Sequence, residues 1–176
     1  MLPKYKYLLT YRYSVLAHDL TLEFCEKNIS KFSRTFDQMV QAARSGKQNI
    51  VEGVGQSDTS KKGEIKLLGV AKASIEELIT DFEDFLRQKG LAIWSKTDPR
   101  IRTYRNLGIE ATKLESPKLV NLPKDPEEAA NLLLTFCHQL TYLLDRQIAA
   151  MEKKFVEEGG FTENLLKKRL ENRLPR

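Results

Sequence analysis

The chain has 176 residues and a mass of 20.3 kDa, with 41% hydrophobic and 30% charged residues. That is enough apolar material for one sizeable core, which excludes intrinsic disorder and a collagen-like fibre. It has only 9 Gly and 6 Pro, which favours an all-α protein because these residues punctuate sheets and loops. The net charge of +5 and the pI of about 9.1 permit a polyanionic partner without requiring one.

Targeting and redox signals favour a cytoplasmic protein. Residues 1–13 are interrupted by basic side chains and lack the apolar run of a secretory signal. The longest uncharged stretch, 129–144, is short and contains polar side chains, so we expect no membrane span. Cys25 and Cys137 are too few for a disulfide scaffold, and both fall within helical patterns. A reducing compartment is therefore the simpler interpretation.

Three long helices are predicted in the first half of the chain. Apolar residues recur at helical spacing over 9–28 and again from Phe36, and the second helix is expected to end at Gly53 and Gly55. A third helix should begin after the capping residues 58–60 and end at Gly90, where a glycine C-cap follows basic residues.

The second half is predicted to contain a long connection, a fourth long helix and a tail. Residues 91–124 break the pattern, and Asp98-Pro99 indicates one short helix inside this connection. Asp125-Pro126-Glu127-Glu128 is the clearest helix start in the chain, and Gly159-Gly160 should end that helix. The pattern predicts an up-down-up-down four-helix bundle over 1–156 and a C-terminal amphipathic helix within 157–176, whose apolar positions include Leu174.

Two stretches carry a family resemblance. Residues 34–53, RTFDQMVQAARSGKQNIVEG, and 71–78, AKASIEEL, resemble the bacterial four-helix-bundle family of proteins encoded in 23S rRNA intervening sequences. The tail EGGFTE at 158–163, followed by basic residues, resembles the variant with a C-terminal suffix. The resemblance implies a ring-forming homo-oligomer, typically a homopentamer, with no assigned enzymatic activity. The family is similar in fold to the accessory variability protein of diversity-generating retroelements, which binds a reverse transcriptase and nucleic acid.

The predicted second helix carries a polar stripe. Its amide and guanidinium groups are suited to hydrogen-bonded recognition, so we expect a subunit or partner interface there; the alternatives are a solvated face or a polar network inside the bundle. Small residues at 42, 43 and 46 are expected to let a second subunit approach closely. The stripe consists of Arg34, Gln38, Gln41, Arg44, Ser45, Gln48, Asn49 and Glu52.

Basic residues cluster at both termini, which makes RNA or DNA a candidate partner. Near the N-terminus they alternate with four tyrosines, a mixture able to stack on bases and neutralise phosphates. The alternative is a solubilising tail together with aromatic packing. The third helix is basic at its start and acidic in its second half, which predicts a cationic and an anionic end. The candidate nucleic-acid-binding residues are Lys4, Lys6, Arg12, Lys167, Lys168, Arg169 and Arg173, with Arg176 beyond them.

A catalytic signature is not recognisable. His18 and His138 are the only histidines, and neither lies at the spacing of a zinc or di-iron motif. We therefore expect no catalytic residues, metal or cofactor. The leading hypothesis is a non-enzymatic oligomeric accessory factor for nucleic acid or a ribonucleoprotein. The alternative is a protein-binding scaffold for a partner enzyme such as a reverse transcriptase.

Overall fold

The protein is all-α. The computed structural model describes residues 2–113 and 120–173, and every regular element in these residues is helical. Leu174, Arg176 and positions 114–119 of the predicted connection lie outside the described residues. The elements are a 3-10 helix η1 (Lys4–Tyr7) and helices α1 (Leu9–Asn28), α2 (Arg34–Gln56), α3 (Lys61–Lys89), α4 (Pro99–Ala111), α5 (Pro126–Glu158) and α6 (Phe161–Glu171).

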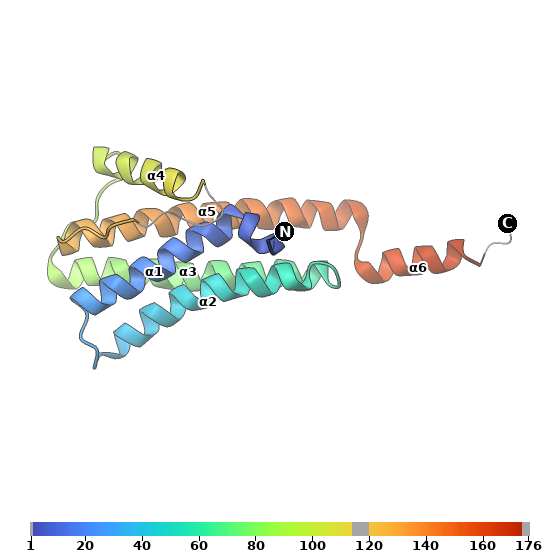
Figure 1. Cartoon of the computed structure of the whole chain (residues 1–176), viewed down its shortest axis with the longest axis horizontal. Coiled ribbons are helices and arrows are strands. Elements are labelled where there is room, and N and C mark those ends of the chain that lie inside the picture. The colour runs from blue at the N-terminus through green and yellow to red at the C-terminus, as the bar shows by residue number, and fades with distance from the viewer. Residues whose placement is uncertain (1, 114–119, 174–176) are drawn as a thin grey trace.

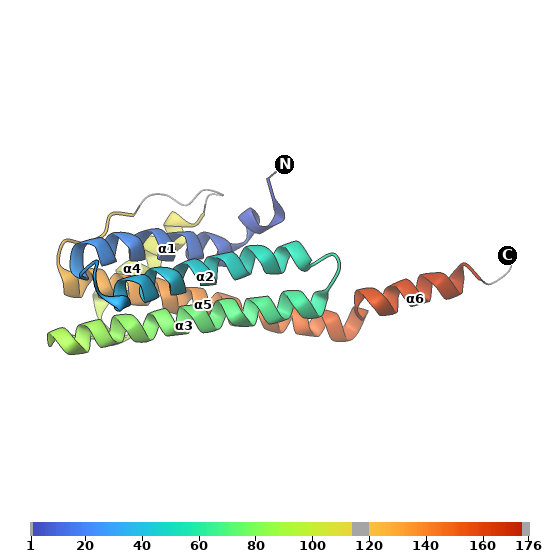
Figure 2. The ribbon, with the colours of Figure 1, turned by 90° about the horizontal axis from the view of Figure 1, so that it is seen from below.

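The four long helices α1, α2, α3 and α5 form the helical body. Helix α1 packs against α2 and α5, and α3 packs against the same two helices. Chain direction alternates between neighbours: α1 and α3 run toward one end of the body, and α2 and α5 run back (Figures 1 and 2). Helix α4 lies outside the body and packs on α5.

Aromatic and aliphatic side chains from all four helices fill the interior. Phe24 of α1 lies edge-on to Phe82 and Phe85 of α3, with ring centroids 5.2 Å and 4.9 Å apart. Phe136 of α5 is fully buried and lies edge-on to Tyr13 of α1. Edge-to-face pairs of this kind add to the stabilisation that comes from burying the rings.

Four predicted helix ends are confirmed by their capping contacts. The side chain of Ser60 accepts a hydrogen bond from the Gly63 N–H at the start of α3, and Gly90 ends that helix with a φ of 67°. Asp98 caps α4, with Pro99 as its first residue. Asp125 accepts from the Glu128 N–H at the start of α5. The three N-terminal caps satisfy backbone N–H donors, and the Gly90 end satisfies backbone carbonyls, which an open helix end would leave unpaired.

The second helix ends one residue beyond Gly55, but neither glycine caps it. Helix α2 continues through Gly53 and Gly55 to Gln56. Gly53 is buried at the contact between α2 and α3, and a Cβ there would lie 3.4 Å from the Glu64 carbonyl oxygen and 3.5 Å from Leu67 Cβ. Gly53 therefore lies at a contact between two helices of the same chain instead of terminating one.

The expectation that small residues of α2 serve a second subunit is also wrong. Gly46, Ala42 and Ala43 are buried within the chain. A Cβ on Gly46 would lie 2.5 Å from Ile75 Cδ1 of α3, so that glycine is needed for packing inside the body. These three residues are therefore not accessible to a second subunit.

Helix α6 stands apart from the body. Helix α5 runs to Glu158, slightly past the predicted end of the bundle region at residue 156, and the link to α6 follows at Gly159 and Gly160. None of the α6 residues is buried. Two perpendicular views show α6 extending away from the end of the body where α5 finishes and α3 begins (Figures 1 and 2).

Candidate interaction surfaces

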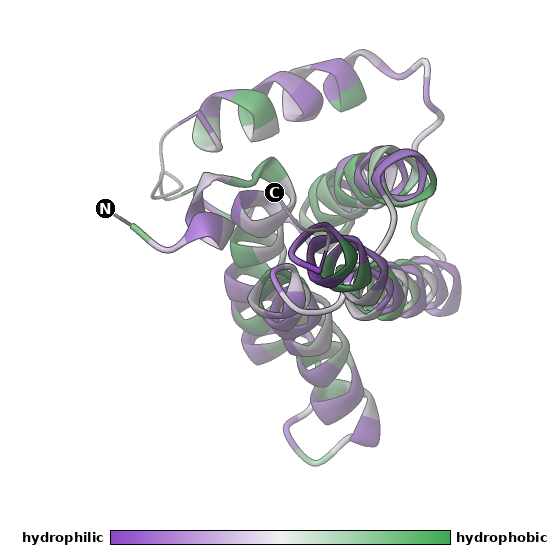
Figure 3. Ribbon diagram, turned by 90° about the vertical axis from the view of Figure 1, so that its right-hand side faces the viewer, coloured by the Kyte–Doolittle hydropathy of each residue, from purple (hydrophilic) through white to green (hydrophobic). Residues whose placement is uncertain are grey.

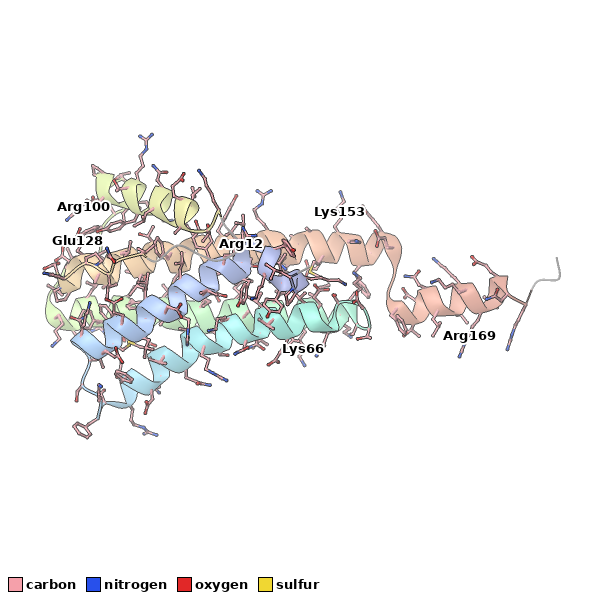
Figure 4. The ribbon with its side chains drawn as sticks, in the orientation of Figure 1. Arg12, Lys66, Arg100, Glu128, Lys153 and Arg169 are labelled. Atoms are coloured by element: carbon pink, nitrogen blue, oxygen red, sulfur yellow. The ribbon has the colours of Figure 1, made fainter. Side chains whose placement is uncertain are left out.

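Basic side chains from four elements gather at the end of the body that carries α6. They come from η1, the start of α3, the end of α5 and α6; Lys66, Lys153 and Arg169 mark this region in Figure 4. Lys167, Lys168, Arg169 and Arg173 are all exposed. Their charges are fully available to solvent, as phosphate contacts require.

Carboxylates near Lys4 and at Glu64 reduce the positive charge at this end of the body. The Lys4 Nζ lies 3.0 Å from Asp58 Oδ2, so this candidate lysine is already paired with a carboxylate of the α2–α3 turn. Lys6 is half-buried, with its backbone carbonyl used inside the fold. Glu64 is only 6% exposed, and burial raises its pKa above the ordinary value although nearby Lys61 opposes that shift.

Arg12 has a structural role and is not placed to bind nucleic acid, which corrects the sequence-based assignment. It is buried in α1. Its Nε donates to the Lys6 carbonyl at 3.0 Å, and its Nη1 donates to the carbonyls of Thr112 and Lys113 at 3.1 Å and 3.2 Å. The guanidinium therefore ties η1 and the end of α4 to α1. Carbonyls at a helix end favour a cation in this way.

The polar stripe of α2 is divided between two environments. Ser45, Gln48 and Asn49 are half-buried. The Ser45 hydroxyl lies 3.0 Å from the Ser74 hydroxyl of α3, and Asn49 Nδ2 donates to the Ser45 carbonyl at 2.9 Å. Ser45 therefore takes part in a polar contact between two helices of one chain, with Asn49 bonded beside it on α2, which is the alternative that the sequence left open.

The exposed part of the stripe remains a candidate interface. Among the residues that the structure describes, none of its side chains forms a hydrogen bond or an ion pair with another. Unpaired amides and guanidinium groups on a helix face can bind a partner without first breaking internal contacts. This set is Arg34, Gln38, Gln41, Arg44 and Glu52.

Two hollows lie beside this stripe. One has a volume of 390 Å³ and is lined by side chains that include Asp37, Gln41 and Glu77. The other, 430 Å³, lies between the α1–α2 turn and the last part of α3, and its lining includes Asp81 and Asp84. We call the second hollow the acidic groove. Gln38 belongs to the lining of both hollows.

Asp81 is held in an unfavourable environment. Its Oδ2 is buried and has no hydrogen-bond partner among the described atoms. Burial, reinforced by repulsion from Glu77 and Asp84, raises the pKa of Asp81 above the ordinary value. A positive partner charge near this carboxylate would relieve the repulsion. The sequence predicted that the second half of α3 is acidic. It did not predict that the turn between α1 and α2 would line a groove with Asp81 and Asp84.

The cluster around Trp94 is a structural site that the sequence analysis missed. The indole Nε1 of Trp94 donates to Glu127 Oε1 at 2.8 Å, and the Ala92 N–H donates to Glu127 Oε2 at 3.0 Å. Tyr104 stacks on one side of the indole, and the Arg100 guanidinium lies 3.4 Å from the ring centroid. Trp94 and Glu127 are separated by more than thirty residues, so helical periodicity in the sequence does not predict their contact. The cluster fastens the α3–α4 connection to the start of α5.

The Glu127 contacts predict an acid-dependent loss of stability. These hydrogen bonds hold the pKa of Glu127 below its ordinary value of 4.5, with the Trp94 bond as the largest cause. A lowered pKa in the folded state stabilises the protein above that ordinary value and ceases to do so as pH falls through the folded-state pKa. Glu127→Gln should therefore destabilise the protein at pH 7, and its difference from wild type should shrink toward pH 3.

Urea unfolding of both proteins across this pH range measures that difference. Glu110→Gln is the control, because Glu110 is exposed and pairs with Lys113 on its own helix. A difference between wild type and Glu127→Gln that stays constant from pH 7 to pH 3 would contradict the assigned role of the carboxylate.

The remaining titratable residues do not assemble into a reactive site in the described part of the chain. Cys25 and Cys137 are both buried and free, and burial raises the pKa of each thiol to about 12, far from the thiolate form. No group of three or more His, Cys, Asp or Glu side chains in residues 2–113 and 120–173 is placed to hold a metal ion. Within the same residues, no helix combines the length and apolar character that crossing a membrane demands.

Comparison with known proteins adds no relative to this description. No protein-family model, no curated protein and no solved structure matches the chain.

Proposed function

We propose that this chain is a non-enzymatic, self-associating protein that acts as an accessory factor for nucleic acid or a ribonucleoprotein in the cytoplasm. In this proposal α1, α2, α3 and α5 form an up-down-up-down four-helix bundle, and α6 is the suffix helix of the 23S rRNA intervening-sequence family. The alternating directions of the long helices support the bundle, and the sequence resemblance supports a ring such as a homopentamer.

The exposure of α6 is the observation that carries the proposal. Its basic side chains are fully exposed, and the helix projects from the end of the body where other lysines gather. Contacts of this kind neutralise phosphates and hold a strand in place but read little sequence, so binding should be sequence-tolerant. Assembly of several copies would multiply a weak site into a useful one.

Reversing two charges on α6 tests this role. Lys167→Glu combined with Lys168→Glu should weaken retention of a labelled oligouridylate. It should also reduce the slope of log affinity against log salt by about 1.4, since each single-strand phosphate contact contributes roughly 0.7. Fluorescence anisotropy between about 50 mM and about 200 mM salt measures the slope. The α6 helix lies outside the core, so the fold should be unaffected.

The matched control is Lys96→Glu combined with Arg102→Glu, which changes the net charge equally on exposed residues near α4. This control should keep the wild-type slope, because those side chains lie far from α6. Failure of wild type to retain RNA or DNA at about 50 mM salt would refute nucleic-acid binding. Equal slopes for wild type and the α6 variant would refute the role of these two lysines.

The alternative function, a scaffold for a partner enzyme such as a reverse transcriptase, is supported by the exposed polar side chains of α2. They lie on an accessible helix face beside the hollows between α2 and α3. Substituting Gln38 and Gln41 by glutamate would weaken binding of a protein partner while leaving nucleic-acid retention unchanged. That outcome, together with loss of the α6 effect, would favour the scaffold.

A further inference from the structure

Helix α6 has an apolar side that stays exposed among the described residues of its own chain. With about 100° between successive residues, four large apolar side chains fall within one half of the helix circumference. Arg169 lies between them, and Lys167 lies on the opposite side. Hydrophilic and hydrophobic segments are both visible on α6 in the end-on view (Figure 3). The apolar side chains are Phe161, Leu165, Leu166 and Leu170, which are 40% to 56% exposed.

The opposite end of the body carries a complementary surface. Phe32, in the turn between α1 and α2, is fully exposed. Its neighbours in the turn line the acidic groove, which also presents Ile29 and Phe85 beside the carboxylates of Asp81 and Asp84. Lys89 is the basic residue in the lining. An apolar segment with positive charge fits this combination better than a neutral or acidic one would.

Helix α6 is too short to reach the acidic groove of its own chain. Helix α6 starts near the beginning of α3. The ends of α5 and α3 are close there, because the charge of Lys154 on α5 lowers the pKa of Glu64 on α3. Asp81 lies about 30 Å further along α3, at about 1.5 Å per residue, whereas Arg169 is only about 12 Å from the start of α6. Folding α6 back on its own body would leave these charges about 18 Å apart.

We infer that α6 of one copy docks in the acidic groove of a second copy, with its apolar side against Phe32 and Arg169 near Asp81 and Asp84. This inference rests on the self-association proposed above and specifies the contact. The two surfaces differ, and they lie at opposite ends of the molecule. The contact is therefore head-to-tail, and it continues from copy to copy until a ring closes. Lys167, on the outer side of α6, stays available for phosphate.

Two variants each remove one side of the contact. Leu166→Asp with Leu170→Asp alters α6, and Phe32→Asp alters the exposed apolar side chain beside the acidic groove; all three residues are exposed, so folding should be preserved. Light scattering coupled to size exclusion, without nucleic acid, should give wild type a mass that is a multiple of 20.3 kDa. Each variant alone should have the mass of a single chain. Ile109→Asp, an exposed apolar residue on α4, is the control and should match wild type.

Mixing the two variants gives the decisive result. The Phe32 variant retains an intact α6 and the α6 variant retains an intact groove, so the mixture should form a complex of two chains and no larger species. A Phe32 variant with wild-type mass beside a monomeric α6 variant would overturn the inference in favour of pairing between two α6 helices.

Wild-type mass in both variants, or a mixture that stays monomeric, would also overturn the inference. Wild-type mass in both variants would still show that the chain self-associates. A monomeric wild type would refute both docking and self-association. Nucleic-acid binding would remain to be judged by the salt slope, which is measured separately.

Discussion

Replacing Phe24 by alanine should lower the free energy of unfolding by about 3 to 5 kcal/mol, the largest effect we expect from a single substitution. Phe24 is fully buried and lies edge-on to two phenylalanines of α3. Alanine would leave a cavity between α1 and α3 and remove both aromatic contacts. Urea unfolding followed by circular dichroism at fixed protein concentration measures the change.

Tyr142→Ala is the matched control for Phe24. Tyr142 is an aromatic residue of similar size on α5, but its side chain is 59% exposed. We expect a change of about 0.5 kcal/mol or less there, as for most surface substitutions. Similar losses at both positions would show that Phe24 does not lie in a closely packed core.

Arg12→Leu should cost about 2 to 3 kcal/mol of stability and leave nucleic-acid binding unchanged. Leucine keeps part of the side-chain volume but removes the donors for the carbonyls of Lys6, Thr112 and Lys113. Leaving buried carbonyls without a charged donor costs more stability than an ordinary hydrogen bond contributes. Arg102→Leu, an exposed arginine on α4, should change stability by about 0.5 kcal/mol or less.

The same two arginine variants decide between the two roles considered for Arg12. A destabilised Arg12→Leu protein that retains the wild-type salt slope supports the structural role. A variant of wild-type stability with a flattened slope would restore Arg12 to the nucleic-acid interface and contradict the contacts described above.

Local signals in the sequence predicted the helix boundaries that depend on local chemistry. Asp98, Asp125 and Gly90 act within a few residues of themselves, through a cap or a left-handed backbone conformation. The same reasoning failed for Gly53, which lies inside α2 at its contact with α3. The sequence alone does not reveal whether a glycine ends a helix or lies inside it at a contact with a second helix.

Candidate surfaces were harder to predict than helices, because charge in a sequence does not reveal burial. Arg12 resembled the other basic residues near the N-terminus, but its partners Thr112 and Lys113 lie about a hundred residues away. Ser45 and Asn49 shared the polar spacing of Gln38 and Gln41 but face α3. The exposed basic side chains of α6 were predicted because a short amphipathic tail has few alternative positions.

The link between α5 and α6 has a geometric consequence. Gly159 has a φ of 73°, which a residue with a side chain adopts at a cost, and the Gly160 N–H donates to Glu163 Oε2 at 2.7 Å. Together they fix the direction in which α6 leaves the body. Under head-to-tail docking, that direction sets the rotation from one copy to the next, and a closed ring requires this rotation to divide a full circle evenly. Under the same docking, Gly159→Ala would alter this joint, and with it the rotation between copies, without touching the core of the body.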